Sequence, residues 1–335
     1  MNILITTAGR RTYLIDYFKQ AIDGNGKIIA ANSVYTYSLS HADEYVITPS
    51  FYSDMYIPFV LQTCKERDVK AIISLLDADA KVLSMHRLEF DRIGTRLLIP
   101  STEVMDICND KLLSYRFLNS IGLLQPKTYN HGSDVKRAIQ SREISFPIII
   151  KPRWGIGSFG VYFVNNENEL DVLSQKLRKD ILNTYMGYES LKDIEGCILY
   201  QEVISGQEYG VQVLNDLSGR YVATFAIKKI AMRSGETDVA EVVEVNPFVS
   251  ESRRISNSLH HVGLLDMDCM ITPDGRLYVI EMNCRFGGQY PFIHLANVNI
   301  PKQILHWLHD EGNDFGLLTP QIGIKACKDL HPVLI

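Results

Sequence analysis

Three carboxylates and an amide lie in a segment that the sequence predicts to be a β-hairpin. Asp274-Gly275 separates two runs of alternating apolar residues, a pattern that favours a two-residue hairpin turn. Counting outward from this turn places Asp268 opposite Glu281, and Asp266 opposite Asn283. Because side chains alternate along a strand, Glu281 and Asn283 share one face. The hairpin therefore gathers oxygen-bearing side chains on one side of two neighbouring strands.

This acidic face has two interpretations. Opposed residues have Cβ atoms about 4.5–5.5 Å apart, where like charges repel, so Asp268 and Glu281 need a counter-charge. Mg²⁺ supplies one, because it prefers one or two carboxylates together with phosphate oxygens. The alternative is a solvated acidic face on which the repulsion is screened. Asn283 and Arg285 favour the metal site, since an amide and a guanidinium on the same face suit a phosphate–metal centre.

A glycine-rich loop supplies a candidate phosphate site. Gly155, Gly157 and Gly160 match G-x-G-x-x-G, but a β-rich run follows them, whereas a dinucleotide-binding loop opens a helix. Strand, loop and strand make a hairpin whose backbone N–H groups can approach phosphates, with Lys151 as a point charge. Protein-kinase motifs and a Walker A motif are missing from the sequence. A flexible hairpin with an exposed lysine is the competing interpretation.

A short apolar segment, Glu202-Val203-Ile204, separates a predicted strand from Glu208. Its backbone can present N–H and C=O groups to an adenine edge, and the acid further on can accept protons from two ribose hydroxyls. Many strand–turn–strand segments have the same composition.

The elements that would position these residues fall into two patterns. Near the N-terminus, apolar runs alternate with amphipathic stretches, which predicts an α/β domain with a mostly parallel sheet over residues 1–100. The expected strands are 2–6, 27–31 and 71–75, and the expected helices are 12–22 and 54–67.

The second pattern is an α+β arrangement. A helix over 112–121 is predicted with Asp110 as its N-cap, and a longer one over 167–185. The strands expected after it are 198–202, 209–214, 221–229, 264–272 and 277–283, and the tail 291–309 is expected to be helical. We expect residues 101–190 to hold a linker helix and a small lid subdomain with the glycine loop at 151–160, and 191–335 to hold a large subdomain.

Composition excludes several function classes. The 335-residue chain has a net charge of −5, which argues against a general nucleic-acid binder. Its six cysteines are scattered without zinc-site spacing. The N-terminus lacks the pattern of a signal peptide, and no apolar stretch is long enough to cross a bilayer. We therefore expect a cytoplasmic protein with no membrane partner.

In this order, the motifs resemble those of the ATP-grasp superfamily. The resemblance rests on Asn109-Asp110-Lys111, on Lys151-Pro152 with its glycine loop, on the 201–208 segment and on Glu281-x-Asn283-x-Arg285. Residues 1–100 look like the preATP-grasp domain of carbamoyl-phosphate-synthase-like members, a Rossmann-like parallel sheet, and Asp77 lies in a segment similar to one which that family uses near its substrate. The implied fold is an α/β preATP-grasp domain followed by an α+β ATP-grasp domain.

The resemblance also implies roles for individual residues. Catalysis is implied for Arg285 and Lys151. The ATP-binding residues implied are Lys111, Lys151, Gly157, Ser158, Glu202, Val203, Ile204 and Glu208. The residues implied to bind Mg²⁺, or Mn²⁺ in its place, are Asp268, Glu281 and Asn283.

The implied activity is that of an ATP-dependent, Mg²⁺-dependent carboxylate–amine ligase, of the amino-acid or peptide type, acting through an acyl phosphate. The chain is short for a carbamoyl phosphate synthase large subunit and lacks the accessory domain of a biotin carboxylase, so we expect a stand-alone enzyme. An ATP-dependent phosphotransferase and a carboxylase-like ATP-grasp enzyme are the alternatives. The expected partners are small carboxylate and amine substrates, and a homodimer is one expected assembly.

The substrates are not readable from the sequence. Arg233 and Arg254 lie near the predicted site in sequence and are candidates, with Asp77, for substrate binding; surface arginines that improve solubility are the alternative. Gly9, Arg10 and Arg11 follow the first strand, at the position where α/β sheets usually bind ligands.

Overall fold

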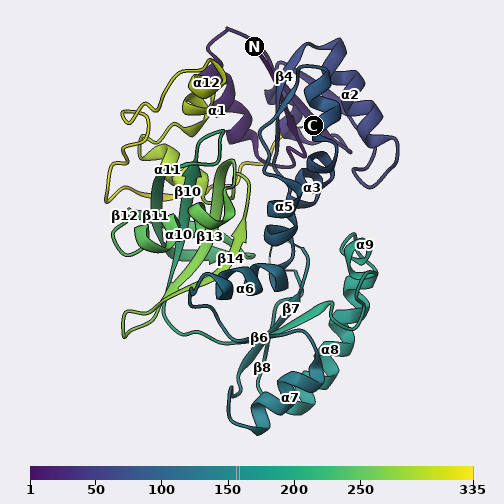
Figure 1. The fold of residues 1–335 in the computed structure, drawn as a ribbon, viewed down its shortest axis with the longest axis vertical. Helices are drawn as coiled ribbons and strands as arrows, with labels where there is room; N and C mark the ends of the chain where they lie inside the picture. Colours follow the sequence, from purple (N-terminus) through teal and green to yellow (C-terminus); the bar gives the residue numbers. More distant parts are fainter. Residues whose placement is uncertain (156, 158, 335) are drawn as a thin grey trace.

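The computed structural model describes residues 1–155, 157 and 159–334, and these form three sheets (Figure 1). The first sheet is parallel throughout, in the order β3-β2-β1-β4-β5. Its strands are β1 (Asn2–Thr6), β2 (Ile28–Asn32), β3 (Glu44–Ile47), β4 (Val69–Ser74) and β5 (Arg96–Leu97). This arrangement confirms the predicted α/β domain.

Helices cover both faces of the first sheet because its strands bury alternate residues on opposite sides. Ile3 and Ile5 pack in one core cluster with α1, whereas Leu4 packs in another with α2 and α3. The helical elements of this part are α1 (Thr12–Ile22), the 3-10 helix η1 (Tyr37–His41), α2 (Tyr56–Glu66), α3 (Asp77–Met85), α4 (Arg87–Arg92), α5 (Thr102–Asn109) and α6 (Lys111–Ser120).

The second sheet belongs to a small lid, residues 126–202, at the bottom of Figure 1. The strands run in the order β6-β9-β7-β8, and the lid has a core cluster of its own. Its elements are β6 (Thr128–Tyr129), α7 (Gly132–Gln140), β7 (Ile148–Pro152), β8 (Tyr162–Val164), α8 (Glu167–Leu182), α9 (Gly187–Ser190) and β9 (Ile198–Glu202).

The lid extends beyond the boundary expected at residue 190. Strand β9 pairs with β7 from Ile148–Glu202 to Pro152–Ile198, so it completes the lid sheet rather than opening the large subdomain. The sequence pattern groups β9 with the later strands because they share its apolar composition, and composition does not report which strands pair.

The third and largest sheet has the order β14-β13-β10-β11-β12-β15 and is antiparallel. Its elements are β10 (Gln207–Asn215), β11 (Tyr221–Arg233), β12 (Glu236–Val243), α10 (Val249–Leu259), β13 (Gly263–Ile271), β14 (Leu277–Asn283), α11 (Tyr290–Leu295), α12 (Ile300–Leu308) and β15 (Lys325–Cys327). The two core clusters of the first sheet continue into this sheet, whereas the lid core is separate.

Two helical expectations were wrong in this part. Helix α10 was not predicted, because its buried stripe includes Ser252 and Ser256 and so carries little hydrophobic signal. The tail is two helices, not one: Asn297 has a positive φ of 72°, and the Asn299 side chain caps α12. None of the helices in the described ranges has the length and apolar character needed to span a bilayer.

The hairpin of β13 and β14 has the predicted carboxylate pairing but not the predicted turn. Ile271 pairs with Leu277, and the Thr272 N–H donates to the Arg276 carbonyl at 3.0 Å, which leaves a three-residue loop. Gly275 takes the left-handed position of this loop, with φ of 85°. A register shift next to Asp268 then adds Ile280 to one strand. The longer loop and this bulge compensate, so that Asp268 still faces Glu281.

Candidate active site

Two adjoining cavities lie where the lid, the large sheet and the first sheet meet. The first, about 320 Å³, lies between the lid and the hairpin of β13 and β14, and the second, about 150 Å³, extends toward the first sheet. They share Gly157, Asp268 and Glu281. The predicted hairpin face and glycine loop therefore line both spaces.

Glu281 lies among cations at the junction of the cavities. The Lys111 Nζ atom is 3.3 Å from the Glu281 Oε1 atom and donates to the Gly155 carbonyl at 2.6 Å. Burial raises the pKa of Glu281, but Lys111, Lys151 and Arg285 outweigh it, and the net pKa is lowered. Glu281 is therefore a carboxylate at neutral pH, despite its burial.

Lys151, at the end of β7, is buried and lines the first cavity. Burial lowers its pKa to about 8; Glu281 opposes this shift and Lys111 adds to it. Among the described residues its ammonium has neither an ion pair nor a side-chain hydrogen bond. An anionic ligand in the first cavity would meet this charge at close range, in a medium of low dielectric.

Asp268 is held by a lysine that sequence reasoning missed. The Lys229 Nζ atom lies 2.6 Å from both Asp268 Oδ1 and Glu208 Oε1, and only 4% of its side chain is exposed. Burial lowers the pKa of Lys229, but the charges of Asp268 and Glu208 outweigh the effect of burial, and the net pKa is raised. Gln289 donates from Nε2 to the same Asp268 oxygen at 2.7 Å. The sequence signals nothing here, since Lys228 and Lys229 are adjacent on one strand.

The lysines change the case for a metal ion. Lys229 and Lys111 already supply the counter-charge that Asp268 and Glu281 require, so the facing carboxylates do not by themselves demand a cation. No group of three or more His, Cys, Asp or Glu side chains among the described residues could hold a metal. Two carboxylates with the amide of Asn283 nevertheless fit Mg²⁺, which usually takes its remaining ligands from phosphates and water.

Asp266 is the least solvated carboxyl of this hairpin. It accepts from Gln212 Nε2 at 3.2 Å, and a Cβ on Gly287 would lie 1.6 Å from its Oδ2 atom. Burial, together with the nearby charge of Asp268, raises its pKa to about 7. The Asp266 carboxyl therefore leaves no room for a side chain at position 287.

The glycine loop joins β7 to β8 as an antiparallel hairpin, as predicted. Gly155, Gly157 and Gly160 all have positive φ values, of 115°, 72° and 66°. A Cβ on Gly155 would lie 2.3 Å from Met186 Sδ, whereas one on Gly157 would meet nothing within 4 Å. Gly157 therefore faces open space between the cavities. Ser158, predicted to bind nucleotide, lies outside the described residues.

The 202–204 segment and Glu208 border the first cavity together, as their predicted roles require. The Glu202 Oε2 atom accepts from the Lys127 N–H at 3.2 Å, so this side chain also fastens the start of the lid. Val203 and Ile204 lie between strands β9 and β10, and their backbone groups make no hydrogen bond within the described part of the chain. The cavity wall opposite is apolar and includes Ile149 and Phe163.

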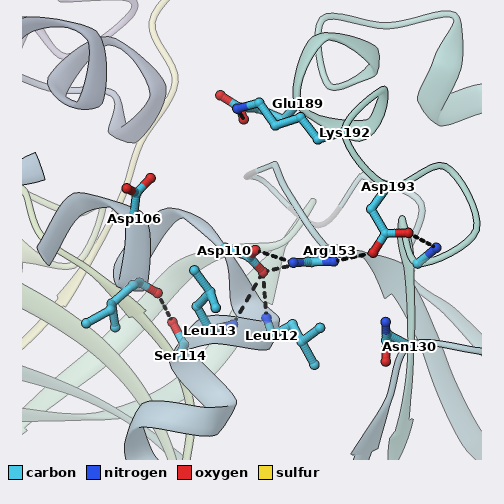
Figure 2. Close-up of polar contacts among 12 residues, drawn as sticks. Asp106, Asp110, Leu112, Leu113, Ser114, Asn130, Arg153, Glu189, Lys192 and Asp193 are labelled. Atoms are coloured by element: carbon cyan, nitrogen blue, oxygen red, sulfur yellow. Dashed lines mark hydrogen bonds and ion pairs between the residues drawn. The ribbon is translucent and has the colours of Figure 1, made fainter. Parts of the chain in front are cut away.

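The predicted cap of helix α6 also connects the helix to the lid, as Figure 2 shows. The Asp110 Oδ1 atom accepts from the Leu112 N–H at 2.9 Å, and both Asp110 oxygens accept from Arg153, at 2.8 and 2.7 Å. Arg153 also donates to Asp193 at 2.9 Å. Since Lys111 follows Asp110 directly, this bidentate pair positions the lysine at the mouth of the glycine loop.

Arg285 and Asp77 form a buried ion pair between the large sheet and the first sheet. The Arg285 Nε atom lies 2.7 Å from Asp77 Oδ2, and the two side chains are 7% and 2% exposed. Burial lowers the pKa of Arg285, but the charges of Asp77 and Asp266 outweigh the effect of burial, and the net pKa is raised. Asp77 therefore lies at the site, as a partner of Arg285.

The two other arginine candidates lie outside both cavities. Arg233 is exposed and pairs with Asp238 at 2.9 Å, and Arg254 is exposed and donates to the Gly122 carbonyl at 3.3 Å. Arg11, by contrast, lines the second cavity together with Glu236. Its position after the first strand was the one signal in the sequence for this residue.

Comparisons with known proteins agree with this architecture. The N-terminal domain of PylC-like proteins matches residues 3–98, and the ATP-grasp domain matches residues 108–289, more than half of the chain. The arginine-specific large chain of carbamoyl phosphate synthase from Bacillus subtilis is 20% identical over 295 residues, covering 85% of this chain and 25% of that protein. The chain therefore spans about a quarter of the length of this relative.

Two solved structures have a similar fold. The biotin carboxylase domain of 2-oxoglutarate carboxylase from Hydrogenobacter thermophilus, in complex with MgADP, ADP and bicarbonate, aligns with a TM-score of 0.76 and 17% identity over 97% of this chain and 73% of that one. An L-amino acid ligase from Bacillus licheniformis aligns with a TM-score of 0.69 and 19% identity, over 91% of this chain and 74% of that one.

Proposed function

Since the chain belongs to the ATP-grasp family, as its motifs indicated, we propose that it is an ATP-dependent ligase that joins a carboxylate to an amine. The reaction would pass through an acyl phosphate and require Mg²⁺. The expected substrates are of the amino-acid or peptide type.

One observation carries this proposal: Glu281 lies at the junction of an apolar-walled cavity and a polar one, with Lys111 and Lys151 beside it. The first cavity suits a purine next to the 202–204 segment, with its phosphates pointing toward the lysines. The second suits the small molecule that receives the phosphoryl group. An acyl-phosphate mechanism needs this arrangement, because the carboxylate must reach the terminal phosphate from the side opposite the nucleoside.

The nucleotide would be held by residues from the lid and the large sheet. Lys111 and Lys151 would neutralise phosphate oxygens, and Gly157 would let the backbone approach them. The backbone of Val203 and Ile204, with Glu202, would bind adenine, and the Glu208 carboxylate would accept from the ribose hydroxyls. Lys229 now holds Glu208, so ribose binding would share that carboxylate with the lysine.

Asp268, Glu281 and Asn283 would hold Mg²⁺. A bound ion would neutralise charge on the phosphates and hold them in place for transfer. The protein side chains supply the rest: Arg285, oriented by Asp77, would donate hydrogen bonds to the oxygens on which charge develops.

The proposed chemistry has two balanced steps. A substrate carboxylate oxygen attacks the γ-phosphorus, the bond to the β–γ bridging oxygen breaks, and ADP leaves with that electron pair. The amine nitrogen then attacks the acyl carbon, the acyl C–O bond breaks with release of inorganic phosphate, and the nitrogen loses a proton. Lys111 and Lys151, whose side chains are largely buried, would favour the first step by offsetting the charge of the phosphates.

The test is ADP formation by the purified protein with ATP, Mg²⁺ and a panel of amino acids and small acids, with and without hydroxylamine. Acid-dependent ADP release with hydroxamate formation is the expected result, and Glu281→Gln should reduce the rate at least about 100-fold. A stable phosphorylated acid that needs no nucleophile would indicate a phosphotransferase. ADP release with bicarbonate alone would indicate a carboxylase-like reaction. The proposal fails if no acid stimulates ADP release.

A further inference from the structure

The first sheet has a topological switch point that faces the second cavity. Its order is β3-β2-β1-β4-β5, so the chain builds outward from β1 on one side and then crosses to β4 on the other. In open α/β sheets, ligands bind at the carboxyl ends of the two strands that flank such a switch. Arg11 lies in the segment after β1, and Asp77 lies in the segment after β4.

Arg11 is fixed in this crevice without a carboxylate partner. Its Nη1 atom donates to the Leu75 carbonyl, which follows β4, at 2.6 Å. Among the described residues no Asp or Glu lies within ion-pair distance of its guanidinium. Burial lowers the pKa of Arg11, and the charge of Arg285 lowers it further, whereas the charges of Asp77 and Glu236 offset only part of this shift.

The other charges of the second cavity are balanced within the protein. Lys229 is neutralised by Glu208 and Asp268, and Arg285 by Asp77. Glu236, across the cavity, pairs with Lys328 at 3.1 Å. Arg11 is therefore left, among the described residues that line this cavity, as the cation without a carboxylate within ion-pair distance.

The lining of the cavity indicates what could supply the missing charge. All its described lining residues are polar, charged or glycine, and its volume is about 150 Å³. This suits a small polar group rather than an apolar side chain. A guanidinium presents a planar fork of donors that matches a carboxylate in two parallel hydrogen bonds.

We propose that Arg11 binds the carboxylate of the acid substrate at the β1–β4 switch point, on the side of the cavity that faces Arg285. This inference rests on the proposed function and deepens it, because it assigns the acid substrate to a subsite formed by the N-terminal domain. Arg11 takes the role for which the sequence suggested Arg233 or Arg254, neither of which reaches the cavity.

Direct binding tests the proposal without requiring turnover. The twenty proteinogenic amino acids, succinate and bicarbonate are titrated by calorimetry into the full-length protein loaded with Mg²⁺ and a non-hydrolysable ATP analogue. At least one of these anions should bind the wild-type protein. Arg11→Gln should weaken that binding about 10- to 100-fold, the range expected when a charged hydrogen bond is lost, and should leave the affinity for the ATP analogue unchanged. Arg11→Lys should recover part of the loss.

Arg10→Gln is the matched control, because Arg10 is the adjacent exposed arginine and lines neither cavity. It should bind the same anion with wild-type affinity. The proposal is overturned if no anion of the panel binds the wild-type protein, or if Arg11→Gln binds as tightly as wild type. If Arg11→Gln does not fold, the proposal is overturned when Arg11→Lys binds the anion as tightly as wild type does. Bicarbonate as the sole ligand would also overturn the proposal, because the subsite would then take an inorganic anion rather than the carboxylate of an organic acid. Hydroxamate formation tests the proposed function separately.

Discussion

At the scale of single residues, Lys229 determines the electrostatics of the site. A buried ammonium is stable only when opposite charges compensate for its lost hydration, and here two carboxylates at 2.6 Å do so. The same contact joins the side chains of Asp268 and Glu208, which both line the first cavity.

Lys229→Met removes this charge while keeping much of the side-chain length. We expect the free energy of unfolding to fall by about 1–3 kcal/mol, because two carboxylates that are each only about one-third exposed are left close together without their shared cation. Added Mg²⁺ should raise the melting temperature of the variant more than that of wild type, since the ion can replace the missing ammonium charge. Thermal unfolding with and without Mg²⁺ measures both effects.

Lys228→Met is the matched control for this experiment. Lys228 precedes Lys229 on β11, and its side chain points to the other face of the sheet. A Lys229→Met protein as stable as this control, or one equally insensitive to Mg²⁺, would contradict the assignment.

His261 makes the stability of the protein depend on pH. It is fully buried, with Nε2 3.2 Å from the Val213 carbonyl. Burial lowers its pKa to about 4, and the carbonyl only partly offsets this shift. In the unfolded chain the pKa is about 6.5, so below that value the unfolded state binds the extra proton, and stability is lost as the pH falls toward 4.

The loss attributable to His261 should reach about 3 kcal/mol at pH 4. Denaturant unfolding of wild type and of His261→Gln at several pH values measures it, and the variant should show a shallower decline between pH 6.5 and 4. His260→Gln changes the exposed neighbour and should keep the wild-type slope. If the free energies of unfolding of wild type and His261→Gln declined in parallel with pH, His261 would not be the source of the pH dependence.

At the scale of elements, the glycine loop combines two different requirements. Gly160 has a positive φ, and a Cβ there would lie 2.5 Å from Leu177 Cδ1 in the lid core. Gly157 has a positive φ but open space around it.

We therefore expect Gly160→Ala to destabilise the lid by about 2–3 kcal/mol, through backbone strain and overpacking, and Gly157→Ala by about 1 kcal/mol. Gly157→Ala should instead weaken binding of an ATP analogue, because its methyl group enters the space between the two cavities. Hydrogen exchange of the lid and calorimetric nucleotide affinity separate the two variants. Equal effects of both on lid exchange would show that the contact with Leu177 does not matter.

Sequence reasoning succeeded where the signal is local. The strands Ile198–Glu202 and Leu277–Asn283, the Asp110 cap and the pairing of Asp268 with Glu281 were all predicted and are confirmed. The pairing of Asp268 with Glu281 was predicted from a two-residue turn, whereas the loop has three residues. An alternating pattern defines which residues share a face but does not reveal a bulge at Ile280.

Contacts between distant segments were beyond local patterns. Arg11 reaches the second cavity because the first sheet packs against the large one, and Lys229 was indistinguishable from Lys228 without the sheet register. Helix α10 escaped detection because its buried face is half serine. The ligand roles given to Lys111, Lys151, Glu202 and Glu208 stay predictions until a complex is measured.

At the scale of the whole molecule, the first and large sheets share continuous cores, whereas the lid has its own. The lid reaches back to the first domain through α9, which approaches the N-terminal part at the right of Figure 1. There the rings of Tyr52 and Tyr188 stack, with centroids 4.3 Å apart and an interplanar angle of 20°. This contact connects the lid to the first domain at a point away from residues 203–206, where the chain passes from the lid into the large sheet.

Tyr52→Ala should remove about 1 kcal/mol of stabilisation from the docked lid. Amide exchange in α9 should then become several-fold faster, while exchange in the first sheet stays unchanged. Tyr45→Ala is the control, because Tyr45 packs its ring against Tyr35 within the first domain. Unchanged exchange in α9 would mean that the stacked rings do not hold the lid.

Lys111 already has two protein oxygens as partners, on Gly155 and Glu281, before any ligand arrives. An incoming triphosphate must displace these two oxygens from Lys111. The affinity measured for the nucleotide is therefore weaker than its contacts with Lys111 alone would give. A cation that draws Glu281 away from the lysine removes this competition. Ion and nucleotide should consequently enhance each other's affinity by one common factor, whichever of the two binds first.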